Sequence, residues 1–169
     1  MKYLLLMPIV FVFTSCSSIM PKNEINGTII EYGIFERSKQ EKNISSPASD
    51  AGTKFVTTSW GKQIERTTKV QAKLGSNTLF GYIFKIEGFD QDGEINLRKT
   101  VIHPEIIKPD GTKSEGFSYI DPFMVENGKI ESYSGWSFDH PYELVDGEWI
   151  IKFEYRGKVI LEKAFTIYK

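Results

Sequence analysis

The chain has 169 residues, of which 21 are Lys or Arg and 22 are Asp or Glu, so its formal net charge is −1. Basic and acidic residues are interleaved along the chain. This pattern argues against a nucleic-acid-binding protein, because such proteins gather basic residues on one face. The length suits a single domain with one hydrophobic core.

Residues 1–15 have the features of a secretory signal peptide. Lys2 supplies one positive charge, an apolar run extends from Tyr3 to Phe13, and small residues precede Cys16. The run is too short to cross a bilayer, which needs about 20 residues. Cys16 is the one cysteine of the chain, and its surroundings resemble the lipobox of bacterial lipoproteins. We expect a lipid anchor at Cys16; an ordinary cleaved signal with an incidental cysteine is the alternative.

A lipid on Cys16 would hold the protein at a membrane of the bacterial envelope. Two or more acyl chains give stable anchoring, since each buried methylene contributes about 0.8 kcal/mol. Ser17 follows the cysteine, which in a Gram-negative host resembles the class sorted to the outer membrane, on its periplasmic side. An acylated cysteine leaves no thiol for a disulfide, so the fold must depend on its core. We expect a polar tether over 16–26 and one domain over 27–169.

The first part of the domain is predicted to hold strands interrupted by a long loop. Residues 27–37 have apolar side chains on both faces, as in a strand that is buried on two sides or that changes sheets partway. Residues 38–53 are polar, and we expect them to form an exposed loop. Residues 54–60 and 64–74 are rich in Thr and Val and are predicted as strands, joined by the turn that contains Trp60.

The middle of the chain alternates apolar and polar residues between turn signals. Residues 80–88 and 94–102 are predicted to pair as a hairpin, and further strands are predicted over 116–120 and 129–139. Each of three X-Pro pairs is expected to end a strand. These pairs are His103-Pro104, Asp121-Pro122 and His140-Pro141.

The last part is predicted as a hairpin around which the domain is built. Trp149, Ile151 and Phe153 share one parity, and a tight turn is expected at Arg156-Gly157. Lys163 interrupts the apolar parity of the return strand, so we predict a bulge or an edge position near it. Residues 144–149 resemble the corner that enters a late strand of immunoglobulin-like sandwiches. The whole pattern predicts an all-β fold, an immunoglobulin-like β-sandwich of about 7–9 antiparallel strands.

His103 and His140 are the two histidines of the chain, and both precede Pro at an expected strand end. If these ends lie together, the imidazoles could hold a metal with Asp121 and neighbouring carboxylates. Hydrogen bonds from each ring to a backbone group are the simpler interpretation. The motifs of serine hydrolases and of phosphate-binding loops do not occur. We therefore expect no cofactor and no enzymatic activity.

Aromatic residues near turns are the candidates for binding a ligand. Trp60 lies beside Gly61 in a turn, and Tyr133 has the parity opposite to Trp136. Such side chains could stack on a glycan or anchor an envelope protein, or they could pack in the core. The predicted contact residues are Trp60, His103, Asp121, Tyr133 and His140.

Several short motifs occur together in the second half of the chain. They are His103-Pro104, Trp-Ser-Phe-Asp at 136–139, Tyr-Glu-Leu-Val-Asp-Gly-Glu-Trp at 142–149, Gly157, and Lys-Ala-Phe-Thr at 163–166. Over residues 117–169 the chain resembles a family of exported bacterial envelope domains of unknown function. This resemblance implies an exported β-rich domain and assigns no activity.

We expect a lipid-anchored envelope protein with a non-catalytic binding or structural accessory role. The alternatives are a small periplasmic metal-binding protein or hydrolase that uses the His103/His140 end, and an inhibitor of a partner enzyme.

Overall fold

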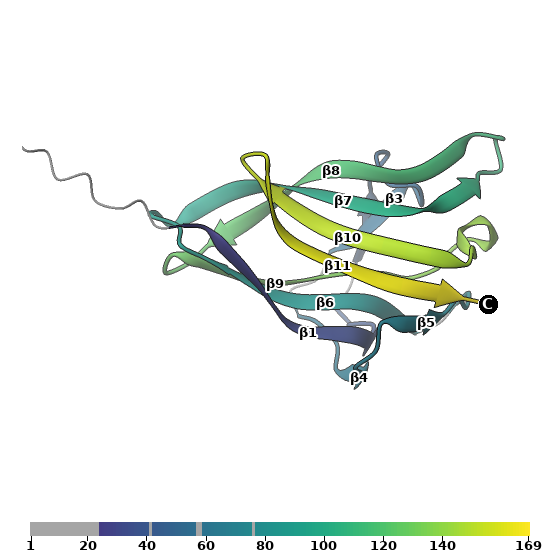
Figure 1. The fold of residues 1–169 in the computed structure, drawn as a ribbon, viewed down its shortest axis with the longest axis horizontal. Coiled ribbons are helices and arrows are strands. Elements are labelled where there is room, and N and C mark those ends of the chain that lie inside the picture. Colours follow the sequence, from purple (N-terminus) through teal and green to yellow (C-terminus); the bar gives the residue numbers. More distant parts are fainter. Residues whose placement is uncertain (1–23, 41, 57–58, 76) are drawn as a thin grey trace, which may run out of the picture.

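The computed structural model describes residues 24–169 except 41, 57–58 and 76, and two packed sheets form its body. One sheet has the strand order β4-β1-β6-β9 and the other the order β5-β11-β10-β7-β8 (Figure 1). Strands β2 and β3 form a separate small sheet. The elements are β1 (Asn26–Glu36), β2 (Lys42–Ser45), β3 (Thr53–Val56), β4 (Gln63–Glu65), β5 (Lys69–Gln71), β6 (Thr78–Glu87), β7 (Gly93–Ile107), β8 (Lys113–Val125), β9 (Lys129–Trp136), the 3₁₀ helix η1 (Pro141–Glu143), β10 (Gly147–Tyr155) and β11 (Lys158–Tyr168).

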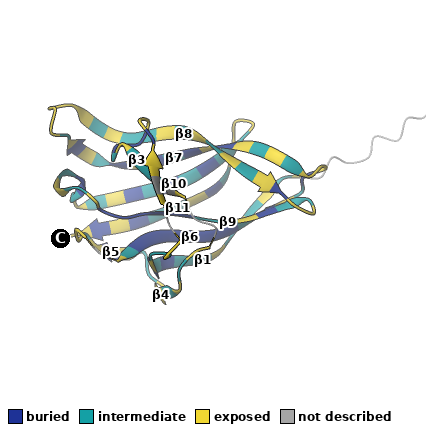
Figure 2. Ribbon diagram, turned by 180° about the vertical axis from the view of Figure 1, so that it is seen from behind, coloured by how far each residue is buried: buried dark blue, intermediate teal, exposed yellow. Residues whose placement is uncertain are grey.

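Large aromatic side chains fill the space between the sheets. Trp149 on β10 is 1% exposed, and its ring centroid lies 6.1 Å from that of Phe80 on β6 and 5.6 Å from that of Phe138. Strand β6 is buried along most of its length (Figure 2), because β1 and β9 flank it and the second sheet covers it. The buried Tyr82 hydroxyl donates to the Ile151 carbonyl of the opposite sheet at 3.2 Å. The core therefore joins the sheets by aromatic packing and by this hydrogen bond.

The predicted last hairpin is confirmed. Strands β10 and β11 pair through the turn, where Arg156 has φ 49° and Gly157 φ 80°. Two successive residues with positive φ match the twist of paired strands. The register shifts between Phe153 and Glu154, where β11 has one extra residue, Ile160, three residues before Lys163. Lys163 lies where β11 has no second neighbour among the described strands, and its ammonium sits 3.7 Å from the centre of the Tyr32 ring. The edge position is thus confirmed, and a cation–π contact accommodates the charge.

The pairing predicted for the middle of the chain is wrong. Residues 80–88 and 94–102 do not form a hairpin, since β6 pairs with β1 and β9, whereas β7 pairs with β8 and β10. The turn between them crosses from one sheet to the other. Alternation along a strand specifies which face is buried but not which strand lies beside it.

The three X-Pro pairs do not all end strands. Strand β7 continues through His103-Pro104 with an irregularity between Ile102 and Ile106. Strand β8 continues through Asp121-Pro122, which is allowed because β8 is an edge strand and needs hydrogen bonds on one side only. His140 is the N-cap residue of η1, which begins at Pro141.

The predicted loop over 38–53 is also wrong in part. It contains β2, which pairs with β3, and the residues that join these strands include the buried Ser46, Ser49 and Asp50. Strand β3 does not pair with β4, and residues 64–74 contain parts of the separate strands β4 and β5. Strand β5 pairs with β11 in parallel, unlike the all-antiparallel prediction.

The predicted signal peptide and Cys16 lie outside the described residues. Strand β1 begins at Asn26, the last residue of the predicted tether. In the described part of the chain, no helix has the length and apolar character needed to cross a membrane.

Replacing Trp149 with Ala should lower the free energy of unfolding by about 3–5 kcal/mol, because it removes the largest fully buried side chain from the core. Urea denaturation followed by circular dichroism measures this. Ile107→Ala, at an exposed position of β7, serves as the control and should change the free energy by about 0.5 kcal/mol or less. Equal effects of the two substitutions would contradict the assigned core.

Candidate functional site

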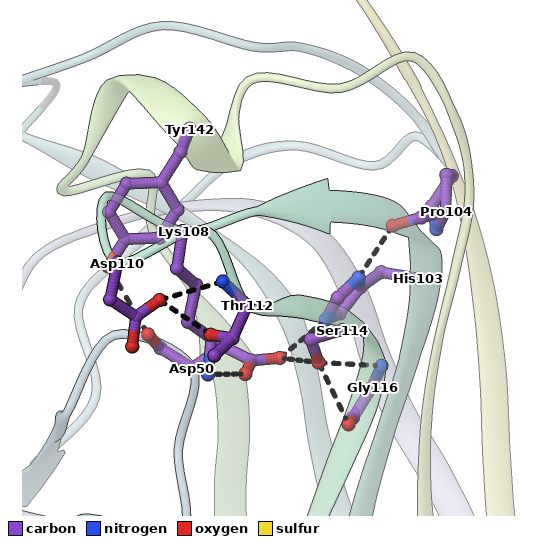
Figure 3. A network of polar contacts seen from close by, with 9 residues as sticks. All are labelled: Asp50, His103, Pro104, Lys108, Asp110, Thr112, Ser114, Gly116 and Tyr142. Atoms are coloured by element: carbon purple, nitrogen blue, oxygen red, sulfur yellow. Dashed lines mark hydrogen bonds and ion pairs between the residues drawn. The ribbon is translucent and has the colours of Figure 1, made fainter.

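The Asp50 carboxylate fixes the β2–β3 hairpin to the sandwich (Figure 3). Its Oδ2 accepts hydrogen bonds from His103 Nε2 at 2.8 Å and from the Ser114 hydroxyl at 2.6 Å. Its Oδ1 forms an ion pair with the Lys108 ammonium at 2.5 Å. The Tyr142 hydroxyl donates to the Asp50 backbone carbonyl at 3.2 Å. Groups from β7, from the turn after β7, from β8 and from η1 thus converge on the tip of the hairpin.

Asp50 remains charged in spite of its burial. Burial raises the pKa of its carboxyl, but hydrogen bonds from Lys108, Ser114 and His103 outweigh this effect and hold the pKa below its ordinary value of 3.8. The other ring nitrogen of His103, Nδ1, lies 2.8 Å from the Pro104 carbonyl oxygen. Both ring nitrogens of His103 therefore lie at hydrogen-bond distance from an oxygen, which fixes the orientation of the ring.

Asp50, His103 and Ser114 are the residue types of a hydrolytic triad, but their arrangement differs from one. In such a triad the imidazole bridges the serine and the carboxylate and takes the serine proton. Here the Ser114 hydroxyl donates directly to the carboxylate, and His103 is bonded to the same oxygen. The carboxylate occupies the centre, so this geometry lacks the imidazole base that takes the serine proton in such a triad.

The structure does not bring the predicted metal ligands together. Both ring nitrogens of His103 are engaged, and the His140 ring stacks on Tyr142 with the centroids 5.0 Å apart. Asp121 pairs instead with Lys54 at 2.6 Å. Among the described residues, no group of three or more His, Cys, Asp or Glu side chains is placed to hold a metal ion.

The remaining predicted contact residues line a groove between the edge strands β8 and β9. The groove has a volume of about 860 Å³, and Trp60, Asp121 and Tyr133 all border it. Val56, Phe123 and Met124 add an apolar wall. Tyr133 also packs edge-on against the buried Phe35, with the ring centroids 5.5 Å apart, so it serves the core as well as the groove. We name this feature the β8–β9 groove.

A small cavity of about 30 Å³ lies where the β2–β3 hairpin approaches both sheets. Its lining includes Lys54 from β3, Lys99 from β7, Tyr119 from β8 and Trp136 from β9. Lys99 and Tyr119 also border the β8–β9 groove, so the cavity adjoins the groove. Burial lowers the pKa of Lys99 to about 8 and raises that of Tyr119. We name this feature the Lys99 cavity.

Residues 23–167 match a family described as a domain of unknown function, DUF3859. The chain belongs to the DUF3859 family. This DUF3859 chain is similar to an immunoglobulin-like protein from Pseudomonas aeruginosa, with a TM-score of 0.60 and 26% sequence identity over 87% of this chain and 98% of that one. The predicted all-β, immunoglobulin-like fold is thereby confirmed.

A second solved structure is the Pseudomonas fluorescens alkylpurine DNA glycosylase AlkC bound to DNA that contains an abasic site analogue. The two sequences are 12% identical, the matched region covers 60% of this chain and 28% of the glycosylase chain, and the TM-score is 0.38. A similarity at this level carries no argument about the DUF3859 chain. A search of curated proteins found no match.

The sequence interpretation missed Asp50, Lys99 and Ser114. Lys99 could have been found, because Leu97, Lys99 and Val101 share one parity of β7 and the two apolar neighbours are fully buried. A lysine on the inward face of a strand is a local conflict that points to a site. Asp50 lies in a polar segment with no periodic pattern, so nothing in the sequence distinguishes it from an exposed aspartate.

Asp50→Asn should lower the free energy of unfolding at pH 7 by about 3–5 kcal/mol, because it removes the buried charge that pairs with Lys108 and accepts a hydrogen bond from His103. The pKa of Asp50 is lower in the folded state, so its stabilisation is present above pH 3.8 and disappears as the pH falls through the folded pKa. The difference between the wild type and the variant should therefore shrink in acid. Urea denaturation at a series of pH values from about 2 to about 7 measures this difference in the free energy of unfolding.

Asp90→Asn is the control, since Asp90 is an exposed carboxylate in the turn before β7. It should change the stability little at any pH. A difference for Asp50→Asn that persists unchanged in acid would contradict the charged role assigned to Asp50.

Proposed function

We propose that this DUF3859 protein is a non-catalytic binding module of the bacterial cell envelope, held at a membrane by a lipid on Cys16. The observation that carries the binding role is the β8–β9 groove, in which Trp60 and Tyr119 lie beside polar groups between two strand edges. Aromatic side chains at a groove provide large contact areas for a protein or a glycan. We propose an envelope protein or glycan as the partner.

The arrangement of polar side chains supports a non-catalytic role. The Asp50 cluster is buried and fastens the β2–β3 hairpin, with each of its polar groups engaged in a structural bond. The metal-binding and hydrolase alternatives depend on His103, whose two ring nitrogens already have partners. The inhibitor alternative would use the same exposed surfaces as the proposed binding role.

The envelope location rests on the N-terminal sequence. Lys2, the apolar run that follows and Cys16 are arranged as in a lipoprotein signal, and residues 17–26 are long enough to separate the domain from a membrane surface. The relative from Pseudomonas aeruginosa is bacterial, which is compatible with this proposal.

Cys16→Ala should abolish incorporation of radiolabelled palmitate and move the protein from the membrane fraction to the soluble fraction. Ser15→Ala, next to the acceptor, is the control and should leave the labelling intact. Both variants are expressed in a bacterial host, and the fractions are compared by immunoblot. Palmitate labelling of Cys16→Ala would overturn the anchor.

A photo-crosslinking amino acid at Met124, an exposed residue of the groove wall, should give a defined cross-linked product in the native envelope. The same amino acid at Ile107, an exposed residue outside the groove lining, is the control and should not give it. Trp60→Ala should weaken the product at position 124 by roughly tenfold if the tryptophan anchors the partner. Equal products at both positions, insensitive to Trp60→Ala, would contradict the groove as the contact surface.

A further inference from the structure

Lys99 carries a buried charge without a matching carboxylate. Its side chain is on the inward face of β7 and is 8% exposed, yet it forms no ion pair with any carboxylate that the structure describes. Asp121, the nearest source of negative charge along β8, is taken by Lys54 at 2.6 Å. The Tyr119 ring faces both ammonium groups, at 4.9 Å from Lys54 and 5.9 Å from Lys99. A buried ammonium without a partner loses several kcal/mol of hydration, so its retention calls for an explanation.

The charges around the Lys99 cavity do not cancel. Lys54 and Lys99 line the cavity together with Asp139; Asp139 pairs with Arg37 at 3.3 Å, and Lys54 pairs with Asp121. The three positive charges (Lys54, Lys99, Arg37) exceed the two negative charges (Asp121, Asp139) by one. A ligand with a single negative charge would neutralise this excess positive charge. A phosphate monoester carries nearly two negative charges at neutral pH and matches this balance less well.

Two further buried polar groups lie at the same place. The Trp136 indole nitrogen and the Ser134 hydroxyl have no hydrogen-bond partner in the part of the chain that the structure describes. Trp136, which is 7% exposed, lines the cavity, and Ser134, which is 3% exposed, borders the groove beside it. Buried polar groups of folded proteins nearly always have a partner, and an indole N–H can only donate. The Lys99 ammonium, which lines the cavity, has only hydrogen-bond donors, so the cavity favours an acceptor such as an anion.

The size of the site limits the anionic group to a few atoms. The Lys99 cavity has about 30 Å³, whereas about 10–15 Å³ is enough for one water molecule, so it admits a group of a few atoms. The adjoining β8–β9 groove is far larger and has Val56, Phe123 and Met124 on its wall. A ligand with a small charged end and an apolar body suits this combination.

We propose that the Lys99 cavity binds the carboxylate of a monoanionic ligand, whose apolar body lies along Phe123 and Met124 in the β8–β9 groove. Lys99 is the counterion, and the Trp136 ring forms part of the cavity wall beside it. This proposal rests on the groove being the binding surface of the proposed function. The carboxylate belongs either to an aliphatic acid or to the end of a peptide.

Paired probes test the charge requirement with the full chain in detergent. Octanoate and N-acetyl-Ala-Ala are the acids, and their amides are the neutral counterparts. Isothermal titration gives the affinities, and the ¹H–¹⁵N signal of the Trp136 side chain reports occupancy of the cavity. At least one acid should bind roughly tenfold or more tightly than its amide and shift the Trp136 signal. Binding of octanoate alone identifies an aliphatic acid, and binding of the dipeptide alone identifies a peptide end.

Lys99→Met removes the charge and keeps most of the side-chain length, so it should weaken acid binding by roughly tenfold or more. Lys152→Met, on the half-exposed face of β10, is the control and should bind as the wild type does. Removal of an unpaired buried charge should leave the unfolding midpoint unchanged or raise it, which shows that the variant is folded. Affinity of the wild type should also fall above pH 8, because the pKa of Lys99 is lowered to about 8.

The proposal is overturned if neither acid binds at millimolar concentration, if an amide binds as tightly as its acid, or if Lys99→Met binds as the wild type does. These outcomes leave the cross-linking at Met124 unaffected, so a failure of the carboxylate site can be distinguished from a failure of the groove.

Discussion

The Asp50 carboxylate joins segments that are far apart in the sequence. It lies between β2 and β3, and its partners come from β7, from the turn after β7 and from β8. Burial of a carboxylate is unfavourable, and it is tolerated here because three donors surround the two oxygens. His103, one of these donors, lies against Trp149 with the ring centroids 4.7 Å apart. The aromatic core and the polar anchor of the β2–β3 hairpin are therefore in direct contact.

The position of the hairpin determines the electrostatics of the Lys99 cavity. Ala51, Thr53 and Lys54 follow Asp50 closely in the sequence and form one side of the cavity. Because Lys54 is held there, it pairs with Asp121 and leaves Lys99 without a carboxylate partner. The anchor thus links a structural interaction to the proposed binding surface, because Thr53 and Lys54 of β3 line the Lys99 cavity.

The sequence predicts the regular part of this protein better than the irregular part. Trp149, Ile151 and Phe153 share one parity, and Gly157 favours a tight turn, so the hairpin could be predicted from local chemistry. The structure has two positive φ angles there, at Arg156 and Gly157. The partners of β6 and β7 could not, because they are set by contacts between residues distant in the sequence. Trp60, Asp121 and Tyr133 were predicted as contact residues and do line one groove. Asp50 has its role only through its partners in the fold.

Amide hydrogen exchange in Asp50→Asn, compared with the wild type under native conditions, tests the anchoring role most directly. The account predicts that protection is lost in β2 and β3 while β10 and β11 remain protected, because the variant releases the hairpin before the sandwich unfolds. Unchanged protection of β2 and β3, or an equal loss throughout the domain, would contradict the role of Asp50 as the anchor of the hairpin.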